Sequence, residues 1–157
     1  MNLSSVEVFK VPKAVLEETQ TSLRAAGRDG HELFVLWSGT QQTTSFIVQN
    51  IHVPRQVAYR TEGGCGVRVG GDALHALSAW LFEHGQVLAA QVHSHPTDAF
   101  HSDTDDTYPI VTALGGLSIV AAYFGRDGLL SPTTAAFRLT AVGWQASPPV
   151  VHLLSEI

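Results

Sequence analysis

The chain has little cysteine, few basic residues and no long apolar run, and each shortage excludes a class of protein. One cysteine, Cys65, among 157 residues excludes an internal disulfide framework. It also excludes a zinc site built from paired thiolates, and a zinc deaminase, which needs a Pro-Cys-x-x-Cys segment. Nine Lys and Arg residues and a formal net charge of -5 provide no basic stripe for a phosphate backbone. Nucleic acid is therefore not expected as a partner, and a positively charged protein partner fits better.

No membrane segment or leader peptide is expected either. The longest mostly apolar stretch, Leu117–Phe124, is far shorter than the roughly 20 residues that span a bilayer. The first residues, Met1 to Lys13, alternate polar and apolar side chains and lack the continuous hydrophobic region of a signal peptide. The sequence predicts a cytoplasmic protein that does not contact a membrane.

Length and apolar content, 45% of the residues, predict one domain over residues 1–157 with a sizeable core. Apolar residues recur every three or four positions in two segments and in short continuous or alternating runs elsewhere, which predicts a mixed α/β fold. We expect one curved mixed sheet with helices packed on it. Expected helices cover 14–26 and 73–84, and expected strands cover 6–11, 31–38, 43–53, 87–92, 117–124, 133–140, 142–145 and 150–154. The strands 31–38 and 43–53 are expected to form a hairpin that turns at Gly39 to Gln42.

One segment has a spacing that predicts a metal site. His93 and His95 follow the apolar run 87–92, and side chains two apart on a strand point to the same side. Pro96 cannot donate to a sheet ladder, so the strand is expected to end there. The loop that follows can fold back over the strand end and bring Asp105 toward the two imidazoles.

Two neutral imidazoles and one carboxylate suit Zn²⁺ and leave the fourth tetrahedral position for water. An open position favours catalysis, because zinc lowers the pKa of its bound water to about 7. Two histidines in such a spacing are more often polar loop residues. The further residues Pro96, Ser102 and Asp105 favour the metal site here.

With these residues the chain resembles the JAMM, or MPN-type, zinc metalloproteases, which also include prokaryotic members. That family reads His-x-His-Pro, a spacer and then Ser-x-x-Asp, matched here by His93 to Pro96 and by Ser102 to Asp105. The spacer between Pro96 and Ser102 is five residues, shorter than in the better-known eukaryotic members. Asp103 and Asp106 flank Asp105, and Asp105 is preferred over both because it keeps the Ser-x-x-Asp relation to Ser102.

The resemblance also implies roles for two further residues. Glu32, at the start of the apolar run 33–37, matches the glutamate that serves as the base in this family. From the sequence alone it is equally an exposed acid at a strand edge. Ser102 matches the serine that donates a hydrogen bond to the oxyanion, and it can also cap the backbone of its own turn. The substrate-binding residues are not indicated. The glycine-rich stretch Glu62–Gly66 is either a plain loop or a flap that pairs with an incoming peptide.

The resemblance implies a fold of the MPN type, one Zn²⁺ per chain and a zinc isopeptidase, similar to deubiquitinases, that cleaves after the C-terminal glycine of a ubiquitin-like protein. Prokaryotic members resemble components of ubiquitin-like conjugation systems, some of them linked to anti-phage defence, so activating and conjugating enzymes would be encoded separately. Two alternatives stay open. The first is a non-catalytic MPN scaffold, and the second is a zinc amidase that acts on a small molecule or on a sulfur-carrier protein. The oligomeric state does not follow from the sequence.

Overall fold

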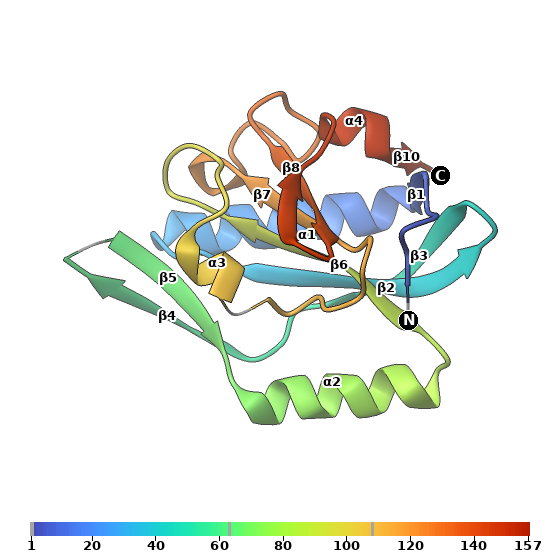
Figure 1. Ribbon diagram of the computed structural model, residues 1–157. Coiled ribbons are helices and arrows are strands. Elements are labelled where there is room, and N and C mark those ends of the chain that lie inside the picture. Colours follow the sequence, from blue (N-terminus) through green and yellow to red (C-terminus); the bar gives the residue numbers. More distant parts are fainter. Residues whose placement is uncertain (1, 63, 108) are drawn as a thin grey trace.

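The computed structural model describes residues 2–62, 64–107 and 109–157, and its centre is a mixed sheet of eight strands (Figure 1). The elements in chain order are β1 (Val8–Val11), α1 (Lys13–Arg28), β2 (Phe34–Gln42), β3 (Ser45–His52), β4 (Gln56–Thr61), β5 (Gly64–Val69), α2 (Gly71–Glu83), β6 (Val87–Ser94), α3 (Asp103–Thr107), β7 (Leu117–Ala121), the 3₁₀ turn η1 (Tyr123–Gly125), β8 (Ala135–Thr140), β9 (Gly143–Ala146), α4 (Val150–Leu153) and β10 (Leu154–Glu156). The sheet order is β10-β1-β3-β2-β6-β7-β8-β9. The predicted mixed α/β fold with a curved sheet and flanking helices is confirmed, and the single domain over residues 1–157 stays a prediction.

Strand β1 runs parallel to both β10 and β3, and β6 runs parallel to β7, whereas the other neighbouring strands are antiparallel. Parallel neighbours need a crossover, and the crossover between β6 and β7 is the long segment that includes α3. This segment leaves the sheet at the end of β6 and returns at the start of β7. The topology therefore places α3 beside the strand end that carries the two histidines.

Helix α1 closes one face of the sheet. Its buried side chains, Val15, Leu16, Thr19 and Leu23, recur every one to four residues along a single stripe. Trp37 of β2 is fully buried against this helix, and its Nε1 donates a hydrogen bond to Thr19 Oγ1 at 2.9 Å. The main core lies between this stripe and the inner residues of the sheet.

The next residue of β2 reaches the opposite face, as the strand period requires. Ser38 Oγ lies 2.7 Å from His52 Nε2, and the His52 ring makes an edge contact with Trp80 of α2. Figure 1 shows α1 and α2 on different sides of the central strands. Unlike α1, helix α2 contains no buried residue and lies loosely over its face.

The hairpin between β2 and β3 turns later than the sequence predicted. Strand β2 continues through Gly39 to Gln42, and the turn lies at Thr43, where φ is 54°. Gly39 is needed for a different reason, because a Cβ atom there would collide with the Ile47 carbonyl of β3 at a register shift. The prediction of a turn at Gly39 to Gln42 is therefore wrong.

The C-terminal segment also differs from the prediction of one strand over 150–154. Residues Val150–Leu153 form the short helix α4, and only Leu154–Glu156 pair with β1. Pro149, with φ of -49°, precedes the helix, and its ring holds φ in the range that a helix start requires. The His152 amide then donates a hydrogen bond to Pro149 O, with 2.9 Å between the two atoms, and closes the turn.

Strands β4 and β5 form a separate two-stranded sheet at the edge of the molecule. The glycine-rich stretch Glu62–Gly66 lies at its turn, and Gly63 lies outside the described residues. From Gly64 onward the stretch is a regular strand rather than a plain loop. Among the described residues, no helix is long and apolar enough to cross a membrane.

The Thr19 hydroxyl gives a test of the packing between α1 and the sheet. It accepts the Trp37 hydrogen bond and donates to Val15 O at 2.7 Å. Replacing it by the isosteric valine leaves a buried indole N–H without an acceptor, so we expect Thr19→Val to lower the free energy of unfolding by about 1–3 kcal/mol. Thr21→Val, on the exposed side of the same helix, should change it by less than about 0.5 kcal/mol in urea unfolding. Equal losses in the two variants would contradict this role of the Thr19 hydroxyl.

Candidate metal centre

The end of strand β6 presents the two predicted histidines together. His93 is the penultimate residue of the strand, and the backbone continues in register past it, because His95 N donates to Ala121 O at 2.9 Å. His95 O in turn accepts from Phe124 N at 2.8 Å. These bonds fix the backbone on both sides of His95 and bring the two Nε2 atoms to 3.2 Å from each other.

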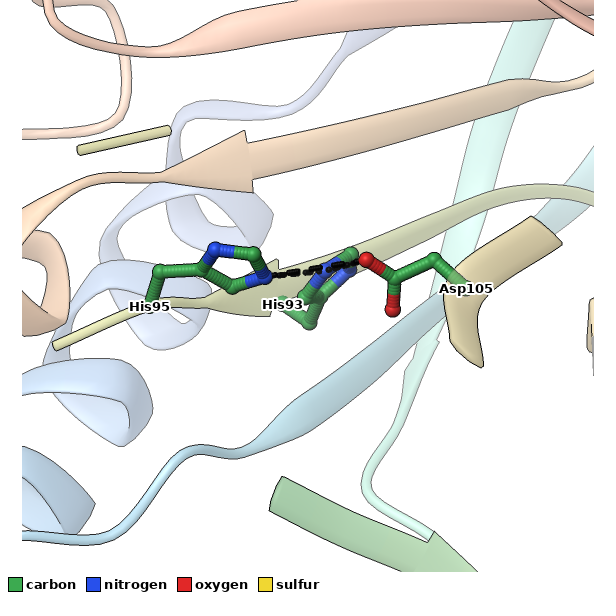
Figure 2. A group of neighbouring side chains, drawn as sticks. All are labelled: His93, His95 and Asp105. Atoms are coloured by element: carbon green, nitrogen blue, oxygen red, sulfur yellow. Dashed lines mark hydrogen bonds and ion pairs between the residues drawn. The ribbon is translucent and has the colours of Figure 1, made fainter. Parts of the chain in front are cut away.

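Helix α3 supplies the carboxylate. Ser102 precedes the helix and forms a reciprocal cap with Asp105: the Asp105 amide donates to Ser102 Oγ at 3.1 Å, and the Ser102 amide donates to Asp105 Oδ2 at 2.8 Å. The cap points the carboxylate at the end of β6. Asp105 Oδ2 lies 3.3 Å from His93 Nε2 and 3.6 Å from His95 Nε2, as Figure 2 shows.

Within the part of the chain that the structure describes, His93, His95 and Asp105 form a group that could bind a metal ion. All three are buried, with 2%, 4% and 9% of their surfaces exposed. Three electron-rich atoms that converge in a buried place repel one another unless a cation or shared protons lie between them. The structure thus brings together the three residues that the sequence predicted as ligands.

The electrostatics of the group favour the protonation states that metal binding requires. Burial by itself would raise the pKa of Asp105, but hydrogen bonds from His93, His95 and the Ser102 amide outweigh it and hold the pKa well below the usual range. Burial lowers the pKa of His93, although Asp105 opposes the shift. The carboxylate is therefore charged and the His93 imidazole neutral near pH 7, as metal ligands must be.

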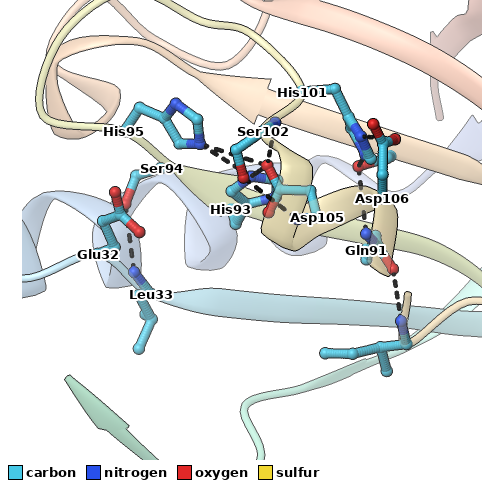
Figure 3. Close-up of polar contacts among 12 residues, drawn as sticks. Glu32, Leu33, Gln91, His93, Ser94, His95, His101, Ser102, Asp105 and Asp106 are labelled. Carbon is cyan, nitrogen blue, oxygen red and sulfur yellow. Dashed lines mark hydrogen bonds and ion pairs between the residues drawn. The ribbon is translucent and has the colours of Figure 1, made fainter. Parts of the chain in front are cut away.

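Glu32 lies on the His95 side of this group, just before β2 (Figure 3). Its position is set by the next residue, because Leu33 N donates to Ser94 Oγ at 3.3 Å. Burial raises the pKa of the half-buried Glu32 carboxyl, while His95 and the Cys65 thiol lower it. The Cys65 thiol, on β5, donates to Glu32 Oε1 at 3.6 Å.

A pocket of about 360 Å³ opens beside Glu32, between the β4–β5 hairpin and the end of α1. Its lining is mostly apolar. It consists of Ala26, His31, Glu32, Leu33, Gln56, Val57, Ala58 and Val67. Gln56 holds the hairpin to the sheet here, because its side chain accepts from Phe34 N at 2.7 Å and donates to Phe34 O at 2.9 Å.

Of the remaining predicted residues, Ser102 serves as the cap of α3, one of the two uses expected for it. Asp106, the alternative to Asp105, turns away from His93 and His95 and lies 2.8 Å from His101 Nδ1. The predicted catalytic roles of Glu32 and Ser102 stay predictions.

Sequence reasoning missed the polar residues that support the site. The contacts of Ser94 with Leu33, of Cys65 with Glu32 and of His101 with Asp106 were not predicted. Gln91, a polar residue in the middle of a buried strand, was the one available signal. Buried polar side chains are hydrogen-bonded in nearly all cases, so Gln91 indicated that another polar group lies against this strand.

Comparison with known proteins identifies a relative over nearly the whole chain and a solved structure with a similar fold. No model of a known protein family matches the chain. A "probable metalloprotease y4jG" of Sinorhizobium fredii is 39% identical over 150 residues, which cover 95% of this chain and 93% of the relative. The solution structure of protein DSY2949 from Desulfitobacterium hafniense has a similar fold, with a TM-score of 0.63 over 96% of this chain and 93% of that chain at 16% identity.

We expect the group to bind one divalent ion per chain, probed with Zn²⁺ added to chelator-treated protein. Addition of zinc should raise the melting temperature, because a ligand that binds only the folded state stabilises it. His95→Ala should lower the zinc affinity by more than the about 10–100-fold that is typical when a residue supporting a ligand is lost, because it removes a ligand itself. His84→Ala, which changes the exposed C-cap residue just after α2, is the matched control. Zinc binding that is unchanged in His95→Ala would contradict the assignment.

Proposed function

This chain belongs to the same family as the probable metalloprotease of Sinorhizobium fredii, and on that premise we propose that it is a metal-dependent peptidase. The observation that carries the proposal is the convergence of His93 Nε2, His95 Nε2 and Asp105 Oδ2 at the end of β6. Glu32, a carboxylate suited to acid–base work, lies near enough to His95 and Asp105 for their charges to act on its pKa. A scaffold protein has no need of this combination, which argues against the non-catalytic alternative.

We propose that the metal is one Zn²⁺ per chain. Donor atoms around a tetrahedral zinc with bonds of 2.0–2.1 Å lie about 3.3–3.4 Å apart. The three separations here are 3.2, 3.3 and 3.6 Å, so the residues fit the ion without rearrangement. When bound, zinc supplies Lewis acidity that polarises a carbonyl and makes water a nucleophile near neutral pH.

In this proposal Glu32 accepts a proton from the attacking water and later donates it to the leaving amine. Its half-buried place and raised pKa suit both steps, because the carboxyl must take up a proton and release it again in one cycle. The bond from Leu33 to Ser94 fixes the backbone next to it, and the Cys65 thiol holds one carboxylate oxygen. No hydrogen bond from the described residues engages the other oxygen, which we assign to the water.

Ser102 can stabilise the oxyanion while it caps α3. A hydroxyl group accepts up to two hydrogen bonds and donates one. The cap uses Ser102 Oγ as an acceptor for the Asp105 amide, which leaves its proton for a substrate oxygen. Such a donor is usually worth a few kcal/mol in the transition state.

The proposed substrate is the C-terminal tail of a ubiquitin-like protein, cleaved after its last glycine, as in the JAMM enzymes that the motif resembles. Strand β5 pairs only with β4 among the described strands, so its other edge can accept an extended peptide as an added strand. The contact of the Cys65 thiol brings this strand close to Glu32. The formal charge of -5 favours a basic tail. In a prokaryotic conjugation or defence system, the activating and conjugating enzymes would be separate proteins.

A zinc amidase acting on a small or sulfur-carrier substrate is the second candidate. The pocket of about 360 Å³ beside Glu32 favours it, because this volume falls in the range of small-ligand pockets, about 300–1,000 Å³. Both candidates use the same metal and the same base, and they differ in whether the substrate is an extended peptide.

The decisive experiment incubates zinc-loaded protein with a ubiquitin-like fusion that ends in glycine before the scissile bond. We expect cleavage after that glycine, and loss of cleavage on addition of a chelator. Glu32→Gln should lower the rate about 10²–10⁴-fold, because it removes the proton acceptor, while the zinc content stays at one per chain. Glu83→Gln, an exposed glutamate on α2, should cleave at the wild-type rate.

Three results would overturn parts of the proposal. Cleavage by Glu32→Gln at the wild-type rate would remove Glu32 from the mechanism. Cleavage that persists after complete removal of the metal would refute a metallopeptidase. Hydrolysis of small amides but not of the fusion would favour the amidase.

A further inference from the structure

The two neighbouring acids of α3 have different partners. Asp105 lies against the His93 and His95 imidazoles, whereas Asp106 Oδ1 lies 2.8 Å from His101 Nδ1 (Figure 3). His101 itself is almost enclosed, with its side chain 5% exposed. Its ring packs against Phe137 of β8 and Trp144 of β9, with ring centroids 5.0 and 5.2 Å away.

His101 connects this helix to the sheet through a chain of buried polar side chains. His101 Nε2 lies 3.1 Å from Ser118 Oγ of β7, and Gln91 Nε2 of β6 donates to the same oxygen at 3.3 Å. Gln91 Oε1 accepts from Ile110 N at 3.0 Å and from Val111 N at 2.9 Å. The segment that crosses from β6 to β7 is therefore tied to the sheet near both of its ends.

One assignment of protons satisfies all of these contacts. Ser118 Oγ accepts from Gln91, so its own proton can be donated to His101 Nε2. His101 Nδ1–H then donates to Asp106 Oδ1. A network in which every member is paired is rigid, because breaking any bond leaves a buried group unsatisfied.

The order Ser118, His101, Asp106 is that of a serine-hydrolase triad, but Ser118 is fully buried between β6 and β8. Its oxygen already accepts a hydrogen bond from Gln91, and no substrate carbonyl can reach it. The arrangement therefore holds structure in place and supplies no nucleophile.

We propose that His101 and Asp106 are positioning residues for Asp105, an inference that rests on the metal site of the proposed function. Helix α3 has five residues, too few to be stable alone. The Ser102 cap fixes its first turn, and the bond from His101 to Asp106 fixes its rotation relative to the sheet. Because Asp105 and Asp106 are adjacent on the helix, the bond that holds Asp106 against His101 also directs Asp105 toward His93 and His95.

The test measures zinc affinity of the full chain by competition with a chromophoric chelator, in the absence of any substrate. Asp106→Ala and His101→Ala should bind zinc about 10–100-fold more weakly than wild type. Asp106→Asn should stay within about threefold of wild type, because its amide oxygen still accepts from His101 Nδ1–H. Thr104→Ala, exposed on the same helix, is the matched control.

The asparagine variant separates the hydrogen bond from the charge, since both Asp106 variants remove the same negative charge near the metal. Equal weakening in Asp106→Asn and Asp106→Ala would overturn the inference, as would wild-type affinity in Asp106→Ala. His101→Ala removes buried packing and can fail to fold, whereas the Asp106 side chain is 55% exposed and its variants retain the core. Failure of wild type to bind zinc would instead refute the metal site itself, and this result is visible before any variant is compared.

Discussion

Two imidazole nitrogens and one carboxylate oxygen lie within 3.6 Å of one another in a buried place, and the rest of the site is arranged around this convergence. Such atoms repel one another through their lone pairs unless protons or a cation lie between them. The backbone bonds of His95 to β7 and η1 and the cap formed by Ser102 hold the three donors in position before any ion binds. Preorganisation of this kind lowers the cost of ordering the site when the metal enters.

The sheet topology explains why these residues meet. Strand β6 lies between β2 and β7, and its end is adjacent both to the segment that carries Glu32 and to the start of the crossover that carries α3. The face occupied by α1 supplies most of the core, the opposite face carries α2 and α3, and the β4–β5 hairpin lies at the edge of the molecule (Figure 1). Stability and chemistry thus occupy different sides of one sheet.

The sequence allowed prediction of the residues whose relation is local. The two-residue spacing of His93 and His95 follows from the strand period, and the relation of Ser102 to Asp105 follows from the geometry of a capped helix turn. The choice between Asp105 and Asp106 was not settled by spacing, because it depends on His101 being fixed to Ser118 of a later strand. The contact of Cys65 with Glu32 joins residues 33 positions apart and depends on how the hairpin folds back. The helix at Val150–Leu153 and the late turn of the β2–β3 hairpin were missed because tertiary pairing overrode the local apolar pattern.

The central claim, that His93, His95 and Asp105 hold one zinc ion and leave an open position, is tested most directly by X-ray absorption at the zinc edge of the loaded protein. We expect a shell of nitrogen and oxygen atoms at about 2.0–2.2 Å, with the outer scattering of two imidazole rings and no sulfur. A sulfur neighbour at about 2.3 Å, which Cys65 would have to supply, or the scattering of fewer than two imidazoles would contradict it.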